Sequence, residues 1–288
     1  MRVYQFQICI IIAIVLFALP VSAISNEEEQ CSQIREAVFD SEHPSNDQSR
    51  FKRLRASKVS LDQLCSFIFA LGWDGPYTPM QWAINYGEID SLRLLISAGA
   101  NVNAQDEKGY TALIFATLYN NPEAIKILIK AGANPNTPDH EGQSPIMKLA
   151  VAQPPEHVAS LKLLLRKGAQ VNATDNAGNT ALILAAGYRD NFEFMRSLIS
   201  SGSNVNIQNT NGETALTMAV LGLRGVCPEK DSACVEPYKR NLALLVDAKS
   251  DLSLRTRKDK TALSIAIECG LPAEILKLLH PQSTKTGK

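Results

Sequence analysis

The sequence predicts an all-α solenoid, in which pairs of helices stack one after another along the chain. A short phrase returns about every 33 residues, for example as Thr-Ala-Leu at 111–113 and again at 180–182. An apolar pattern at helical spacing follows each copy, as in Ile-Lys-Ile-Leu-Ile at 125–129, and a glycine such as Gly132 comes soon after it. A fixed period of this length is typical of stacked repeats.

Residues 1–23 are predicted to be a secretory signal peptide. An apolar run at 8–19 follows Arg2, and Pro20 breaks it before the small residues that end at Ala23. An uncleaved membrane anchor is the alternative, but this run of about 12 apolar residues is shorter than the roughly 20 that a bilayer requires. We therefore expect cleavage after Ala23 and a periplasmic or secreted protein.

Residues 24–72 have helical patterning but lack the repeated phrase. Asn26 followed by three glutamates is typical of a helix start, and Ser60 precedes a second helical pattern. Because the end of a solenoid needs a polar outer face, we interpret this segment as a helical N-terminal cap. Its basic run at 51–58 is interpreted as a solvated helix face, with an acidic partner or lipid headgroups as the alternative.

Residues 73–281 carry the repeats, and residues 282–288 form a C-terminal tail. A Thr or Ser one residue before Pro or Ala is expected to cap the first helix of each pair. The second helices carry apolar stripes such as Leu161, Leu164 and Leu165. Glycines at the ends of these helices allow a left-handed turn. The expected caps are Thr78, Thr111, Ser144, Thr180, Thr214 and Thr261, and the glycines are Gly99, Gly132, Gly168 and Gly202.

These motifs resemble the ankyrin repeat. The opening Asp-x-x-Gly-x-Thr-Ala-Leu occurs at 106–113 and 175–182, and the closing Gly-Ala-x-x-Asn begins at Gly99, Gly132 and Gly168. The resemblance implies an ankyrin-repeat solenoid of about six repeats, with β-hairpin loops between the helix pairs and a C-terminal cap. It also implies a non-catalytic scaffold that binds a protein.

Two insertions and one substitution depart from the pattern. The turn at 153–157 is widened, and extra residues span 223–239; insertions in repeats usually form loops on one face. Lys249 stands where a helix-ending glycine is expected, which should strain that turn.

Five cysteines follow the signal peptide, as expected for an oxidising compartment. We predict a disulfide between Cys227 and Cys234, which lie close together in the insertion. Cys31 and Cys65 are a candidate second pair, with two buried thiols as the alternative. Cys269 is expected to be a solitary thiol.

Charge and motif content favour a protein partner over other classes. The 29 basic and 29 acidic residues balance, so nucleic acid is not an expected partner. We find no Cys-x-x-Cys pair and no nucleophile, metal-hydrolase or phosphate-loop motif, so neither a catalytic site nor a cofactor or metal is expected. Nothing indicates membrane insertion after signal cleavage, and we expect a monomer.

The resemblance places the binding surface on the hairpin tips and on the concave face of the first helices. Three tyrosines lie eight residues after their caps, at Tyr86, Tyr119 and Tyr188, and could provide hot spots or simply line the surface. Trp82 and Lys148 replace the leucine usual in the family four residues after the cap. The hairpin-tip candidates are Glu107, Lys108, Tyr110, His140, Glu141, Asn176, Asn179 and Glu213.

We therefore expect an exported scaffold that binds a periplasmic or envelope protein and inhibits, protects or assists it. One alternative is a secreted effector that binds a host protein. Another is a redox or stress-protection factor that uses Cys227 and Cys234.

Overall fold

The computed structural model describes residues 78–280, apart from 98, 153–156, 189–190 and 227–231. Within these residues the chain forms helices joined by turns and no strand. The chain divides between Glu107 and Lys108 into two compact units. The predictions that lie outside the described residues concern the signal peptide, the N-terminal cap, the C-terminal tail, Cys31, Cys65 and Cys227, together with the side chains of Trp82 and Cys234.

The first unit contributes one helix pair to the described residues. Helices α5 (Pro79–Asn85) and α6 (Ile89–Ser97) pack against each other through buried side chains such as Met80 and Leu92. Thr78 begins this pair with a reciprocal cap, because its backbone N–H donates to Gln81 Oε1 at 2.7 Å and its hydroxyl accepts from the Gln81 N–H at 3.4 Å.

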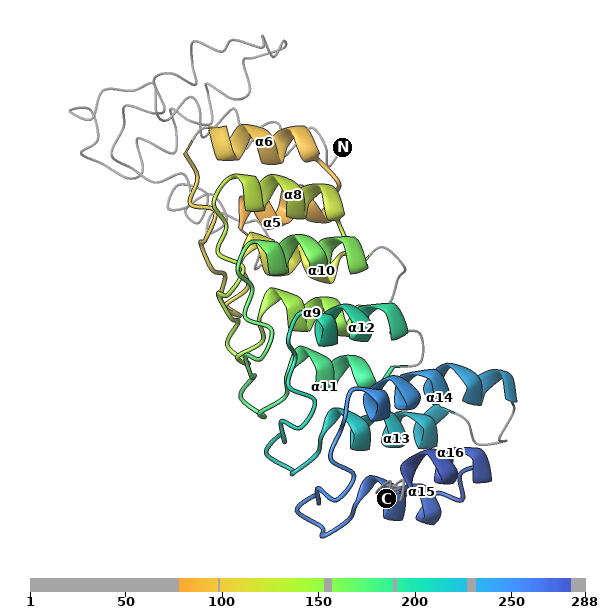
Figure 1. Cartoon of the computed structure of the whole chain (residues 1–288). Coiled ribbons are helices and arrows are strands. Elements are labelled where there is room, and N and C mark those ends of the chain that lie inside the picture. Colours follow the sequence, from red (N-terminus) through yellow and green to blue (C-terminus); the bar gives the residue numbers. More distant parts are fainter. Residues whose placement is uncertain (1–77, 98, 153–156, 189–190, 227–231, 281–288) are drawn as a thin grey trace, which may run out of the picture. The chain divides into compact units, whose positions relative to one another are not determined.

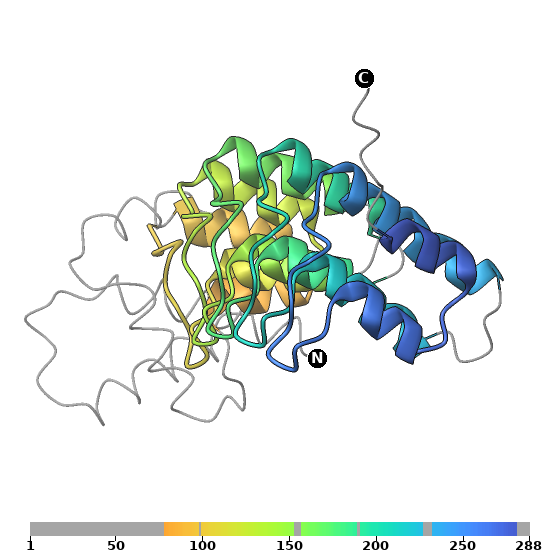
Figure 2. The same ribbon diagram turned by 60° about the horizontal axis from the view of Figure 1, so that its bottom comes forward.

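The second unit stacks five further helix pairs in two layers (Figures 1 and 2). Each first helix packs against the next first helix, and each second helix against the next second helix. The first layer is α7 (Ala112–Leu118), α9 (Pro145–Val151), α11 (Ala181–Ala186), α13 (Ala215–Val226) and α15 (Ala262–Glu268). The second layer is α8 (Pro122–Lys130), α10 (His157–Arg166), α12 (Phe192–Ser200), α14 (Ser232–Asp247) and α16 (Ala273–Leu279). The predicted all-α solenoid of helix pairs is confirmed.

The core runs between the two layers of this unit. Leu128, Leu164 and Leu198 occupy equivalent places on successive second helices and are fully buried. Burial of one such leucine contributes roughly 1.5–3 kcal/mol, and no single helix pair could bury its apolar stripe alone. Stacking is therefore what makes each pair stable.

The predicted caps begin the first helices. Thr111, Thr180 and Thr261 each accept a hydrogen bond from the N–H three residues later, at 3.1, 3.2 and 3.2 Å. Thr214 accepts in the same way from the Thr217 N–H at 3.3 Å. Ser144 has the same extended backbone, and its own N–H donates to Met147 Sδ at 3.5 Å. The hydroxyl thus caps the first helix at the four threonines, whereas the buried Ser144 Oγ accepts no such hydrogen bond.

The glycines that end the second helices have the left-handed backbone that the sequence predicts. Gly132 and Gly168 have φ of 92° and 87°. The next N–H, that of Ala133, donates back to the Leu128 carbonyl at 3.0 Å, as a helix-ending motif requires. Lys249 occupies the same place after α14, in the fourth pair of this unit, with φ of 65°, which confirms the strained turn.

Replacing Lys249 with glycine is expected to stabilise the protein by roughly 0.5–1 kcal/mol. Glycine removes the left-handed strain of about 1–2 kcal/mol, but part of that gain is offset by the greater freedom of glycine in the unfolded chain. Urea unfolding followed by circular dichroism measures the difference. A K249A variant, which keeps a Cβ, should gain nothing, whereas an equal gain in both variants would point to loss of the lysine charge instead.

The second insertion is largely helical, so the expectation of an inserted loop is wrong for most of it. Helices α13 and α14 extend into the inserted residues because apolar side chains there are buried, among them Leu223, Val235 and Tyr238. A Cβ on Gly222 would clash with the Gly187 carbonyl oxygen, so α13 passes very close to the end of α11. Among the residues that the structure describes, no helix is both long enough and apolar enough to cross a membrane.

Candidate functional site

The turns that precede the first helices form a ladder, and we call them the fingers: 139–143, 175–179, 209–213 and 256–260. Each finger is closed by a hydrogen bond between its first N–H and its last carbonyl, for example from Asp139 to Gln143 at 3.0 Å. The Oδ1 atom of Asp139 also accepts from the backbone N–H groups of Glu141 and Gln143 at 2.9 and 2.8 Å. Asp175 and Asn209 do the same in their own fingers. Asp139 and Asp175 therefore stabilise their turns by accepting backbone hydrogen bonds.

Successive fingers are joined by backbone hydrogen bonds. The Asn176 N–H donates to the Glu141 carbonyl at 3.0 Å, and the Thr210 N–H donates to the Ala177 carbonyl at 2.9 Å. The same contact joins the His140 N–H to the Lys108 carbonyl at 3.1 Å and the Arg257 N–H to the Asn211 carbonyl at 2.8 Å. The finger tips in the second unit are therefore held at fixed spacing, although no strand forms there.

Close approach of neighbouring fingers explains their glycines. A Cβ on Gly142 would lie 2.6 Å from Asn176 Oδ1, and one on Gly178 would lie 3.0 Å from the Thr210 nitrogen. Asp259 occupies the same place in the last finger with φ of 58°. Within the described residues no further finger packs on that one, so a side chain is accommodated there at the cost of left-handed strain alone.

A second set of bonds joins the loops behind the fingers. Asn136 Nδ2 donates to the Gly168 carbonyl at 2.9 Å, and Asn136 Oδ1 accepts from the Gln170 N–H at 2.8 Å. Asn172 repeats both bonds with Gly202 and Asn204. These bonds between repeats were not predicted from the sequence. The recurrence of these asparagines four residues after each helix-ending glycine was the available signal.

The hairpin-tip candidates separate into an exposed group and an internal group. Glu107, Lys108, His140, Glu141 and Asn176 are exposed. The others, Asn179, Glu213 and Tyr110, are half-buried and interact within the ladder. Asn209 Nδ2 donates to Asn179 Oδ1 at 2.8 Å and to Glu213 Oε2 at 3.0 Å. The Tyr110 ring lies against Lys148. The exposed group is the part of this set that a partner can contact directly.

Lys148 is buried, and the interpretation of this residue as part of an exposed surface is wrong. Only 5% of the residue is exposed. Its Nζ lies 2.6 Å from Asp139 Oδ2, 3.8 Å from Glu141 Oε2 and 5.1 Å from the centre of the Tyr110 ring. The lysine sits where the other first helices carry apolar side chains because it neutralises the buried carboxylate of its own finger.

Tyr119 and Tyr188 lie at the far ends of the first helices from the fingers of the second unit. Tyr119 follows the last residue of α7, is 50% exposed and stacks on Phe115 with ring centres 4.6 Å apart. Tyr188 follows α11 and is half-buried, and its carbonyl accepts from Asn241 Nδ2 at 3.0 Å. Tyr86, in the first unit, is 48% exposed. Within the second unit, Tyr119 and Tyr188 and the finger tips are therefore two separate candidate surfaces.

Sequence reasoning missed several exposed positions. Ile267, on α15, is 57% exposed, and Leu184 and Met218 are half-exposed rather than packed. The last finger presents Arg257 and Lys258 to solvent. The basic character of this finger could have been read from the sequence, since four cations lie between 255 and 260. The repeat motif does not include such a basic cluster.

Two ionisable groups near the end of the array have shifted pKa values. The Ser253 hydroxyl and N–H both donate to Asp251 Oδ1, which lowers the pKa of that carboxyl below its usual range. Its contribution to stability is therefore present above the ordinary pKa of aspartate and is lost as the pH falls through the lowered value. Hydrogen bonds from Lys239 to Glu274 and Glu236 raise the pKa of that lysine, and they join α14 to α16.

Residues able to bind a metal do not gather in the described part of the chain. No group of three or more His, Cys, Asp or Glu side chains there is arranged to hold an ion. Cys269 follows α15 as a free, half-buried thiol.

The family model for ankyrin repeats in three copies matches residues 51–139, 118–209 and 147–228, which together span more than half of the chain. The chain belongs to the ankyrin repeat family. The match begins upstream of residue 73, within the segment that we interpret as a cap, and α15 and α16 add a helix pair beyond its end.

Solved ankyrin structures resemble this chain over about 70% of its length. An ankyrin repeat domain from Acinetobacter baumannii AYE is 34% identical, with a TM-score of 0.60, and the match covers 70% of this chain and 95% of that one. The ankyrin repeat protein EF0377 is 25% identical, also with a TM-score of 0.60, and the match covers 69% and 95%. A search of curated proteins found no match. Ankyrin repeats generally mediate protein–protein interaction, and the fold is typically a non-catalytic scaffold.

Proposed function

We propose that this ankyrin protein is exported from the cytoplasm and binds an envelope or periplasmic protein through its fingers and first helices. The finger ladder carries the proposal, because its hydrogen bonds hold exposed polar tips such as His140, Glu141 and Asn176 at fixed spacing. A surface that is ordered before binding loses little conformational entropy when a partner docks. The apolar run at 8–19 supports export.

Inhibition or protection of the partner fits this geometry best. A rigid row of tips can cover an active-site opening without folding on binding. Half-exposed Leu184 and Met218 on the first helices add apolar contact area beside the polar fingers. Interfaces of this type combine an apolar centre with a polar rim.

Pull-down from envelope extract tests this function with two variants. H140A/E141A removes exposed finger-tip side chains without touching the backbone bonds of the ladder, and we expect at least a tenfold loss of the captured partner. Y119A removes an exposed ring at the opposite end of α7 and acts as the matched control, with capture expected to be unchanged. Circular dichroism verifies that both variants fold.

Other outcomes would redirect the proposal. Loss of capture with Y119A but not with H140A/E141A would move the binding surface to the tyrosine edge. Capture from host extract, with none from envelope extract, would favour a secreted effector. We retain the redox alternative only for Cys227 and Cys234, and alkylation with mass spectrometry tests it, since a readily reduced pair would favour redox chemistry over a structural bridge.

A further inference from the structure

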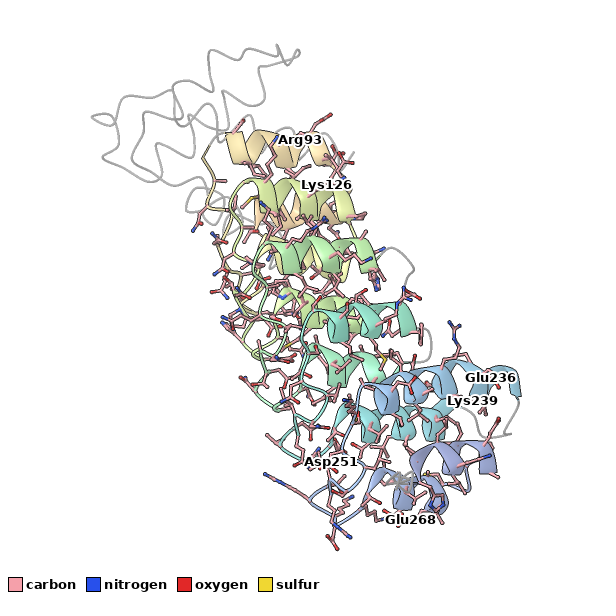
Figure 3. The ribbon with its side chains drawn as sticks, in the orientation of Figure 1. Arg93, Lys126, Glu236, Lys239, Asp251 and Glu268 are labelled. Atoms are coloured by element: carbon pink, nitrogen blue, oxygen red, sulfur yellow. The ribbon has the colours of Figure 1, made fainter. Side chains whose placement is uncertain are left out.

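The second layer of the solenoid carries an exposed basic surface, formed by α8 and α10 and separate from the fingers. Lys126 and Lys130 lie on α8, and Lys162 and Arg166 lie on α10, with Lys167 directly after it. All five are exposed. Figure 3 shows Lys126 on α8, and Figure 1 shows α10 as the next helix of the same layer. We call these five residues the basic patch.

Helix geometry gathers these cations into one area. Residues four apart lie on the same side of a helix at about 6 Å, so Lys126 and Lys130 are neighbours, as are Lys162 and Arg166. Helices α8 and α10 pack against each other, and packed helices lie roughly 8–10 Å apart. The patch is therefore comparable in size to the Debye length of about 10 Å at moderate salt, so its charges act together.

Few acidic groups oppose the patch. Glu123 is the one acidic residue on α8, and α10 has none. Among the described residues, no carboxylate pairs with any of the five cations. On α12, the next helix of the second layer, the cation is neutralised, because Arg196 is paired with Glu193 at 2.6 Å. On α14, Lys239 is likewise paired with Glu236 and Glu274. The positive charge is thus concentrated on α8 and α10.

The composition of the patch indicates what it binds. Protein interfaces depend on apolar or aromatic anchors. The large apolar side chains that stand exposed in the described residues are Tyr86, Tyr119 and Ile267, and none of them lies on α8 or α10. A plane of anionic headgroups needs no such anchor, because each nearby Lys or Arg contributes about 1 kcal/mol of attraction, or roughly fivefold in affinity. We propose that the basic patch docks the protein onto an anionic phospholipid surface without insertion.

A vesicle-binding assay tests the proposal with the full-length chain. The probes are vesicles of phosphatidylcholine alone and vesicles that also contain phosphatidylglycerol. Since the apolar run at 8–19 would bind both kinds, binding to neutral vesicles is subtracted. We expect a preference for the anionic vesicles that disappears near 1 M salt, where the Debye length falls to about 3 Å. K126E/K162E should lower the remaining affinity by more than about tenfold.

A charge-matched variant separates the patch from overall charge. R257E/K258E makes the same change on the last finger and should leave vesicle binding unchanged. Equal losses in the two variants would show that net charge alone is responsible, and absence of any preference for anionic vesicles would also overturn the proposal. So would tight binding of polyglutamate to the patch without vesicle binding, which would make an acidic protein the partner. If the vesicle assay overturns the proposal for the basic patch, the proposal that the fingers capture a protein partner is unaffected, because the pull-down tests it separately.

Discussion

Replacing Lys148 with methionine is expected to lower the free energy of unfolding by roughly 3 kcal/mol, although methionine occupies the equivalent place at Met218. The lysine Nζ lies 2.6 Å from Asp139 Oδ2, and both residues are buried. Removing the cation leaves a buried carboxylate oxygen without its counter-charge, which costs more than the new apolar contacts return. Urea unfolding followed by circular dichroism measures the loss.

A double variant provides the control. D139N/K148M replaces the charged pair with a neutral amide and an apolar side chain, as in the finger that uses Asn209. Because no charge is then buried, we expect it to recover most of the loss and to unfold within about 1 kcal/mol of the parent. If K148M alone unfolds like the parent, Lys148 does not stabilise the fold by neutralising Asp139.

Replacing Gly142 with alanine is expected to cost roughly 3 kcal/mol, the second of the two largest effects. The backbone there is left-handed, with φ of 80°, and a Cβ would lie 2.6 Å from Asn176 Oδ1 and 2.8 Å from the Asn176 nitrogen. Left-handed strain of about 1–2 kcal/mol therefore adds to a steric clash that forces two fingers apart. Urea unfolding gives the total, and faster hydrogen exchange of the Asn176 N–H should show that its bond to the Glu141 carbonyl is weakened.

Gly132 supplies a matched comparison because it shares the strain and lacks the clash. Its φ is 92°, and no atom lies within 4 Å of an added Cβ. G132A should therefore cost only about 1 kcal/mol and leave exchange in the fingers unchanged. Equal losses in G132A and G142A would mean that close packing of the fingers contributes nothing beyond backbone strain.

The sequence predicted those features of the fold that one repeat determines by itself. A hydroxyl residue at a cap such as Thr111 satisfies an amide three residues away, and Gly132 ends a helix through its own backbone, so both recur and can be recognised. Even the exception at Lys249 could be predicted, because it breaks a strictly local rule.

Features that depend on contact between repeats were not predicted. The hydrogen bonds of Asn136 join residues more than thirty positions apart in the sequence. The backbone hydrogen bonds between fingers likewise depend on the distance between successive repeats. Lys148 was misjudged for another reason: its partner, Asp139, lies in its own finger, but the repeat motif does not show that this carboxylate is buried. The tyrosines were placed on the concave face from their position in the repeat, and Tyr119 follows the last residue of α7, at the other end of that helix from its cap Thr111. The insertion became helix because Tyr238 and its neighbours find a place in the core.

Site-specific photo-crosslinking in cells tests the central claim most directly, that the fingers bind a protein. A photoreactive amino acid at His140, on an exposed finger tip, is compared with one at Arg196, which is exposed on the second-layer helix α12. We predict a discrete protein adduct from position 140 and none from position 196, with the adduct lost when export is blocked. A protein adduct from position 196 with none from position 140 would contradict the account, because it would place the partner on the second layer.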